Sequence, residues 1–242
     1  MSDLIIPDWP APDNVKAVSS TRQGGYSLPP YQSLNLGNHV GDDPSLVLQN
    51  RRSLQRRARM PAVPYWLNQT HSATVLTLPS SLSEPDADAT FSNKRQQICT
   101  VMTADCLPVL FCNREGTAVA AAHAGWRGLC NGILENTVRH FSKPAEVIAW
   151  LGPAISVAAF EVGTEVRQAF ISHQLQAEQA FVAQSEHKWR ADLYLLARQR
   201  LASVGVTAVY GGDYCTFTQQ QRFFSYRRDG LTGRMASCIW LE

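Results

Sequence analysis

The apolar and polar positions along the chain predict short strands and helices in turn. Runs rich in β-branched and apolar residues, separated by turn residues, predict strands over 98–102, 107–112 and 117–122. Apolar residues at helical spacing then predict a helix over about 127–141, and a further apolar run predicts a strand over 147–151. This order of elements is one β-α-β unit.

The same patterns extend the architecture on both sides of this unit. Asp43-Pro44 is typical of a cap followed by proline at the first helical position, and predicts a helix to about Arg59. The remaining predicted elements are helices near 161–172 and 191–204 and strands near 206–210, 223–227 and 235–240. Because no linker or repeat interrupts the chain, we expect one domain over residues 1–242, an α+β sandwich of mixed β-sheets flanked by helices.

Length and composition indicate a sizeable core, since 45% of the 242 residues are hydrophobic. The 22 basic and 20 acidic residues leave a net charge of +2, far from the basic surface that nucleic acids require. Nowhere do about 18 apolar residues follow one another, and no signal-peptide pattern occurs at the start. We therefore expect a cytoplasmic protein that binds neither nucleic acid nor membrane, as a monomer or weak homodimer.

One cysteine and two histidines, Cys106, His71 and His123, lie in segments that a helix interior would not choose. Two imidazoles and one thiolate make three zinc ligands and leave the fourth tetrahedral position open, as in catalytic zinc sites. Each residue alone is more often a core residue than a ligand. Their separations of 35 and 17 residues match no standard zinc pattern, so the prediction depends on the fold bringing three loops together.

A second chemistry uses the same residues. An imidazole beside the Cys106 thiol, from either His123 or His71, would lower the thiol pKa and produce a nucleophilic thiolate. The sequence does not separate this dyad from a zinc site, because both need the same side chains in contact. The other five cysteines are expected to be reduced core residues.

Three arginines are candidates for binding an anion such as phosphate. Arg22 lies beside Gly24-Gly25, a pair that permits close backbone approach to a bound group. Arg127 opens a predicted helix, where backbone N–H groups favour anions. Arg227 lies in the C-terminal run Ser225-Tyr226-Arg227-Arg228.

Three further polar residues complete the candidate site. Asn35 and His39 lie in an ordered, turn-rich loop, and loops of that kind are often functional. Asp88 is either a general acid or base, or a structural cap, and the sequence leaves both open. Asn35, His39 and Asp88 are therefore expected, with Arg22 and Arg227, to bind substrate or phosphate.

At these residues the chain resembles the bacterial YfiH family, relatives of the laccase-domain-containing protein. The resemblance runs nearly end to end, and its most specific motifs are Ala104-Asp105-Cys106-Leu107-Pro108-Val109 and His123-Ala124-Gly125-Trp126-Arg127-Gly128. Supporting motifs are Ser20-Thr21-Arg22-x-Gly24-Gly25, Ser33-Leu34-Asn35-Leu36-Gly37, Gln69-x-His71, Gly152-Pro153-Ala154-Ile155, Phe224-Ser225-Tyr226-Arg227-Arg228 and Thr232-Gly233-Arg234. The chain departs from the family at Thr70, where valine is common, and at Ser156-Val157, where Gly-Pro is usual.

The resemblance implies a sandwich with two mixed sheets and a zinc ion held by His71, Cys106 and His123. Family members are variously labelled polyphenol oxidases, purine nucleoside phosphorylases and peptidoglycan editing factors. The implied activities are phosphorolysis of adenosine, inosine, guanosine and methylthioadenosine, and deamination of adenosine. On this basis we expect a zinc enzyme that acts on purine nucleoside and phosphate, with His71, Cys106, His123 and Arg127 as its catalytic residues.

Two other enzyme classes remain open at this point. A multicopper oxidase needs many imidazole ligands, and six histidines with no His-x-His pair do not supply them, although one Cu²⁺ can replace Zn²⁺ in a three-ligand site. A cysteine amidase or peptidase acting on a peptidoglycan precursor would instead use the thiol–imidazole dyad. A regulatory ligand site without catalysis is the least favoured reading.

Overall fold

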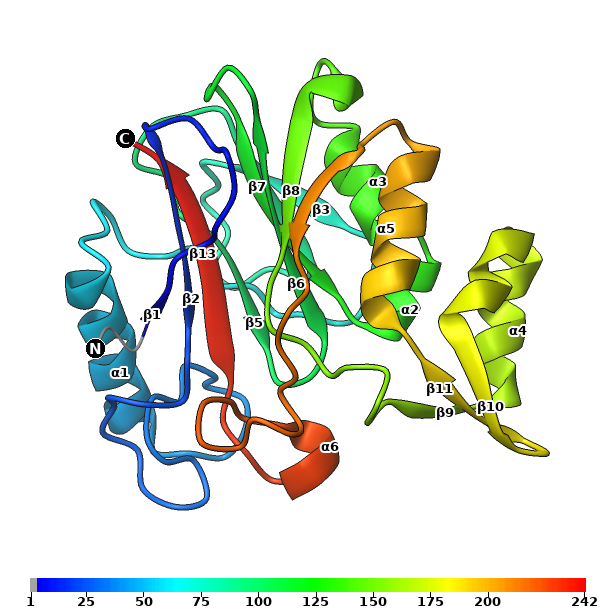
Figure 1. Cartoon of the computed structure of the whole chain (residues 1–242). Helices are drawn as coiled ribbons and strands as arrows, with labels where there is room; N and C mark the ends of the chain where they lie inside the picture. The colour runs from blue at the N-terminus through cyan, green and yellow to red at the C-terminus, as the bar shows by residue number, and fades with distance from the viewer. Residues whose placement is uncertain (1–3) are drawn as a thin grey trace.

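The computed structural model describes residues 4–242, and two β-sheets form its centre (Figure 1). One sheet has the order β1-β2-β13-β5 and is antiparallel throughout. The other has the order β12-β8-β6-β7-β4-β3 and is mixed, since β12 pairs with β8, and β3 with β4, in parallel. The strands of the two sheets are β1 (Leu4–Ile5), β2 (Val15–Ser20), β3 (Val75–Leu78), β4 (Ala89–Ser92), β5 (Cys99–Thr103), β6 (Leu107–Asn113), β7 (Val119–Ala124), β8 (Val147–Leu151), β12 (Ala208–Gly211) and β13 (Met235–Leu241).

Helices cover both outer faces of this sandwich, and a small three-stranded sheet lies at one side (Figure 1). The α-helices are α1 (Pro44–Arg57), α2 (Trp126–Cys130), α3 (Ile133–Val138), α4 (Thr164–His173), α5 (Leu193–Ser203) and α6 (Tyr226–Asp229). The short 3-10 helices are η1 (Pro144–Glu146) and η2 (Leu175–Ala180). The small sheet consists of β9 (Glu161–Gly163), β10 (Phe181–Ser185) and β11 (Lys188–Ala191). Among residues 4–242, no helix combines the length and apolar character needed to cross a membrane.

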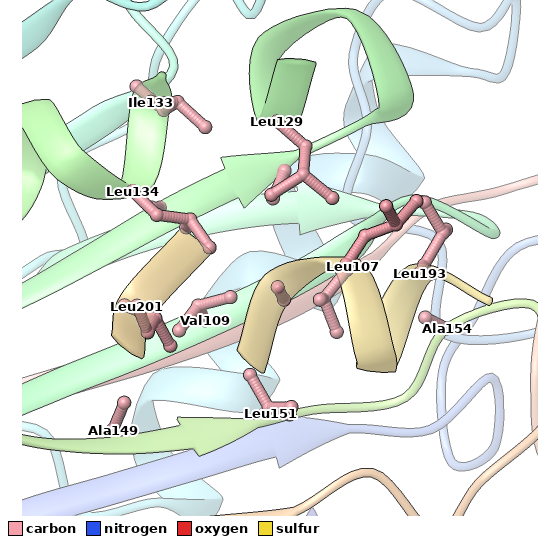
Figure 2. Packing of buried hydrophobic residues seen from close by; sticks show 14 of the residues in the cluster. Leu107, Val109, Leu129, Ile133, Leu134, Ala149, Leu151, Ala154, Leu193 and Leu201 are labelled. Atoms are coloured by element: carbon pink, nitrogen blue, oxygen red, sulfur yellow. The ribbon is translucent and has the colours of Figure 1, made fainter. Parts of the chain in front are cut away.

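Strand β6 shows how the sequence builds the layers. Successive side chains of a strand point to opposite faces. Leu107, Val109 and Phe111 accordingly pack under α2, α3 and α5, whereas Leu110 and Cys112 pack between the two sheets. Figure 2 shows the first of these clusters, in which Leu129 and Leu134 from the helices meet Leu107 and Val109. A third cluster lies under α1.

The antiparallel pairing of β6 with β7 brings two predicted site residues to one end of the larger sheet. Pro108 pairs with His123, so Cys106, just before β6, lies next to the end of β7. The predicted β-α-β unit is confirmed: β7 leads through helices α2 and α3 to β8, and β6 lies between the two parallel strands. The prediction that the sandwich is α+β with flanking helices is also confirmed, although only the larger sheet is mixed.

Several predicted elements differ from the structure. The helix predicted over 127–141 is two helices, because Gly132, with a φ of 91°, interrupts it. Residues 161–163 are strand β9 rather than helix, since they pair with β11. The strand predicted over 223–227 is wrong: Phe223 and Phe224 are fully buried, and Ser225 caps α6 by accepting from the Arg228 N–H. Strands β1, β2, β3, β4, β10 and β11 were not predicted, since their short, polar or alanine-rich sequences carry little β signal.

Candidate metal centre

Three donor atoms from separate segments converge at the end of the larger sheet. The ligand atoms of His71, Cys106 and His123 all lie within 4.8 Å of one another, and Cys106 Sγ lies 3.9 Å from His71 Nε2. Tetrahedral zinc with bonds of about 2.1 Å to nitrogen and 2.3 Å to sulfur holds such atoms roughly 3.6 Å apart. The donor set therefore fits a zinc ion after a small inward movement, and the three residues can hold a metal ion.

All six cysteines are free; five are buried, and Cys106 alone is only partly buried. The other five lie in the core, where burial raises the pKa of Cys99, Cys112 and Cys238 to about 12. These three therefore remain protonated thiols. Cys106 is distinguished from them by its position at the surface of a cavity and by its two imidazole neighbours.

The backbone takes an unusual conformation next to the ligands. His71 has a φ of 61° and Asp105 a φ of 95°, a left-handed region that residues other than glycine rarely adopt. Hydrogen bonds hold both positions. The Asp105 carboxylate accepts from Thr216 Oγ1 and from the Arg227 N–H, each at 2.6 Å. These backbone conformations fix the position of the Cα atoms from which the His71 and Cys106 side chains extend.

The Asp88 side chain forms hydrogen bonds to both candidate histidine ligands. Its buried carboxylate accepts from His123 Nδ1 at 2.8 Å and from the backbone N–H groups of His71 at 3.0 Å and Ser72 at 2.6 Å. Because a carboxylate only accepts, His123 Nδ1 carries the proton and Nε2 is left for a metal. Burial raises the pKa of Asp88, but hydrogen bonds from His123 and Ser72 more than offset this and leave the pKa lowered.

Asp88 is fully buried, so the prediction that it binds substrate needs correction. It touches the ligands rather than the cavity, and it positions them. The sequence left a structural role open for this residue, and the structure favours that role over acid–base catalysis.

Gly125 leaves the space that the ligands occupy. A Cβ atom at this position would lie 2.7 Å from His71 Cδ2 and 3.0 Å from Cys106 Sγ. Its φ of −63° is open to any residue, so only the contact with the ligands requires glycine here. The spacing His123-Ala124-Gly125 thus places one ligand and clears room for the other two.

Without a metal, the Cys106 thiol and the His123 imidazole form a charged pair. Burial raises the Cys106 thiol pKa, but the charge and hydrogen bond of His123, followed by the hydrogen bond of His71, lower it to about 6. Burial lowers the His123 pKa, and Cys106 and Asp88 more than compensate, raising it to about 9. Between these values the pair is thiolate and imidazolium, which are the states expected for a reactive cysteine.

A cavity of about 450 Å³ opens above the donors, and we name it the metal cleft. Its lining comprises His39, Gln69, His71, Met102, Ala104, Cys106, His123, Arg127, Tyr226 and Arg234. Arg127 and Arg234 give the cleft two cations. Burial, followed by repulsion from Arg234 and Arg51, lowers the pKa of His39 and favours its neutral form. The structure thus brings two expected residues, Arg127 and His39, to the three candidate metal ligands.

Three other expected residues do not line the metal cleft. Asn35 is fully buried, and its amide bonds the Gly37 backbone and the Arg234 N–H, so it holds a loop. The Arg227 guanidinium donates to the Glu161 carbonyl. Arg22 lines a separate cavity. For Asn35 the predicted substrate contact is wrong, because no atom of its side chain is accessible.

A family model described as "Multi-copper polyphenol oxidoreductase laccase" matches residues 16–242. The chain belongs to this family. It is 58% identical over 243 residues to the "Purine nucleoside phosphorylase YfiH" of Escherichia coli strain K12, covering 100% of both chains. It is 52% identical to the "Purine nucleoside phosphorylase" of Haemophilus influenzae, covering 98% of this chain and 99% of the relative. The resemblance to YfiH proteins is thereby confirmed.

Solved structures of family members have the same fold. The crystal structure of Neisseria meningitidis protein NMB0706 is 53% identical, with a TM-score of 0.96 over 99% of each chain. The Bacillus licheniformis hypothetical protein YfiH is 29% identical, with a TM-score of 0.92 over 100% of this chain and 97% of that chain. The fold of this family is thus retained at much lower sequence identity.

Three polar residues of the metal cleft, Gln69, Tyr226 and Arg234, were not among the predicted site residues. Gln69 pins the loop before His71 to β5, because its amide donates to the Met102 carbonyl and accepts from the Met102 N–H. Tyr226 is 61% exposed at the cleft, and Arg234 adds the second cation. All three lie in motifs that carry the family resemblance, and that was the available signal for them.

Proposed function

We propose that the chain is a zinc-dependent purine nucleoside phosphorylase that also deaminates adenosine. The observation that carries the proposal is the convergence of His71, Cys106 and His123 at a cleft with two arginines. The names of the relatives supply the substrate class, purine nucleoside with phosphate. Adenosine, inosine, guanosine and methylthioadenosine are the proposed nucleosides.

His71 Nε2, Cys106 Sγ and His123 Nε2 would hold the zinc ion. A zinc ion with an open coordination position is a Lewis acid, and that is the chemistry that hydrolytic deamination requires. Asp88 keeps His123 in the tautomer that presents Nε2, and Gly125 keeps the three donors within reach of one another. If copper occupies the same donors, it does so as a single ion.

Phosphorolysis assigns other roles to the chain's own residues. Arg127 and Arg234 bind phosphate, since both are cations on the cleft wall and guanidinium groups suit phosphate oxygens. Tyr226 offers an exposed aromatic ring beside Arg234, and a purine base can stack on it. Neutral His39 supplies a hydrogen bond without adding charge. Phosphate and nucleoside are thereby held against each other in one cavity.

A cysteine amidase is the second candidate, and one observation favours it. The thiol pKa of about 6 and the adjacent His123 are typical of a nucleophilic cysteine. The two candidates make opposite demands on the same atoms, because a metal-bound thiolate is not free to attack.

Metal analysis of freshly purified protein, together with nucleoside turnover, tests the proposal. Turnover is measured with and without phosphate, after treatment with a chelator, and after zinc is restored. We expect base release that needs phosphate, and loss of both activities on metal removal with recovery on zinc addition. Activity that survives complete metal removal but stops on thiol alkylation would support the amidase instead. Recovery with copper alone, together with phenol oxidation, would support the oxidase.

A further inference from the structure

The cavity that contains Arg22 is larger than the metal cleft and has its own lining. It measures about 810 Å³ and is lined by Arg22, Gln23, Pro30, Gln32, Ser33, Gln220, Gln221, Arg228, Asp229 and Leu231. We name it the Arg22 cavity. It shares no lining residue with the metal cleft. The segment 226–234 separates the two, because Tyr226 and Arg234 line the cleft while Arg228, Asp229 and Leu231 line the cavity.

The charges of this lining do not balance. Two arginines and one aspartate leave a net charge of +1. Asp229 is committed to Arg228, since Arg228 Nε donates to Oδ1 at 2.8 Å and Arg228 Nη2 to Oδ2 at 2.7 Å. Arg228 also donates to the carbonyls of Thr216, Phe217 and Phe223. The positive charge that remains is that of Arg22.

Arg22 is held rigidly while part of its guanidinium stays available. Nε donates to the Gln32 carbonyl at 3.0 Å and Nη1 to the Gln220 carbonyl at 3.2 Å, and the group lies 4.7 Å over the Phe224 ring. An arginine has five N–H donors, so three remain beyond these two bonds. Within residues 4–242, no carboxylate forms an ion pair with Arg22. Burial lowers the pKa of Arg22, the charge of Asp229 partly offsets this, and Arg228 lowers the pKa further, so the loss of water is not fully compensated.

We propose that the Arg22 cavity is a second binding site, for a small molecule that carries a carboxylate or phosphate group. The anionic group would take the free N–H donors of Arg22, and the four glutamine side chains of the lining would bond the rest of the ligand through their amides. The site is independent of the metal cleft. A bound anionic group would neutralise the charge of Arg22, which no carboxylate of the lining pairs with.

NMR spectroscopy of the full-length protein tests this site with two probes, inorganic phosphate and acetate, titrated separately at constant ionic strength. The signals followed are the arginine Nε–H and glutamine amide resonances. In the wild type, Arg22 and Gln220 signals should shift and saturate. Arg22→Gln should weaken this binding by about tenfold or more, since a hydrogen-bonded charge is lost. Arg52→Gln removes the same charge from an exposed position of α1 and should leave the binding unchanged.

A second variant keeps Arg22 in place. Gln220 is exposed and lines the cavity, so Gln220→Glu adds a carboxylate that competes with the ligand for Arg22. Phosphate or acetate should then no longer shift the Arg22 signal. Three results would overturn the proposal: no saturable shift in the wild type, equal binding in Gln220→Glu and wild type, or shifts confined to Arg127 and other residues of the metal cleft. The comparison of the two probes shows which anion the site prefers.

Discussion

The Asp88 carboxylate lies 2.8 Å from His123 Nδ1 and also accepts the His71 N–H, so one buried group orients two of the three candidate metal ligands. The sequence distance between Asp88 and His123 hides this relationship, which arises because β4 and β7 pair in the larger sheet. The candidate metal centre therefore depends on the pairing of β4 with β7 for its geometry. The three ligand residues do not set this geometry without Asp88.

Asp88→Asn is expected to weaken zinc binding by about 10- to 100-fold, because an amide presents only one oxygen to donors that the carboxylate accepts with two. Competition with a chromogenic chelator measures the zinc dissociation constant. Asp86→Asn is the control, since Asp86 is exposed and bonds Asn68. An unchanged dissociation constant in Asp88→Asn would show that Asp88 does not position the ligands.

Gly125→Ala tests the space between the ligands. The added methyl group would lie within 3.0 Å of His71 and Cys106 atoms, so we expect metal retention and nucleoside turnover to fall at least tenfold. The backbone conformation suits alanine, so thermal unfolding of the metal-free protein should be close to that of the wild type. Full zinc occupancy in this variant would mean that the donors can move apart without cost.

Cys106 should react as a thiolate in the metal-free protein. Its pKa of about 6 lies below the usual value, so the thiolate fraction, and with it the rate of iodoacetamide alkylation, rises with pH and is half-maximal near pH 6. Cys99, Cys112 and Cys238, with pKa values of about 12, should not react at neutral pH. Peptide mass mapping locates the modification, and zinc should protect Cys106. A half-maximal rate near pH 9 would contradict the charged pair.

Arg127→Gln should raise the KM for phosphate about tenfold, because a charged hydrogen bond to the anion is lost. Steady-state kinetics at saturating inosine measure this change. Arg52→Gln again serves as the control for net charge. A KM that stays at the wild-type value would remove Arg127 from the phosphate site.

Elements whose conformation is decided by local sequence patterns could be predicted, whereas elements decided by contacts between distant segments could not. Strands β6 and β8 carry strong apolar patterns and were predicted to within one residue, and β7 to within two, which placed Cys106 and His123 near strand ends. Short strands such as β4 were missed, since pairing with β7 decides their conformation. Tertiary contacts override local propensity in these segments.

In the candidate site, too, some residues could be identified from the sequence and others could not. The three residues that converge, His71, Cys106 and His123, could be singled out by their chemical types and the motifs around them. Asn35 and Arg22 lie in equally distinctive motifs, yet one is buried and the other lines a different cavity. Motif residues that build a loop and residues that face a ligand look alike in sequence, and only burial separates them.

We propose that His71, Cys106 and His123 together hold one zinc ion. Elemental analysis of the purified wild type and of His71→Ala, Cys106→Ala and His123→Ala measures zinc per chain, with circular dichroism to confirm folding. We expect about one zinc per chain in the wild type and little in each folded variant. A variant that retains one zinc per chain and wild-type nucleoside turnover would contradict it.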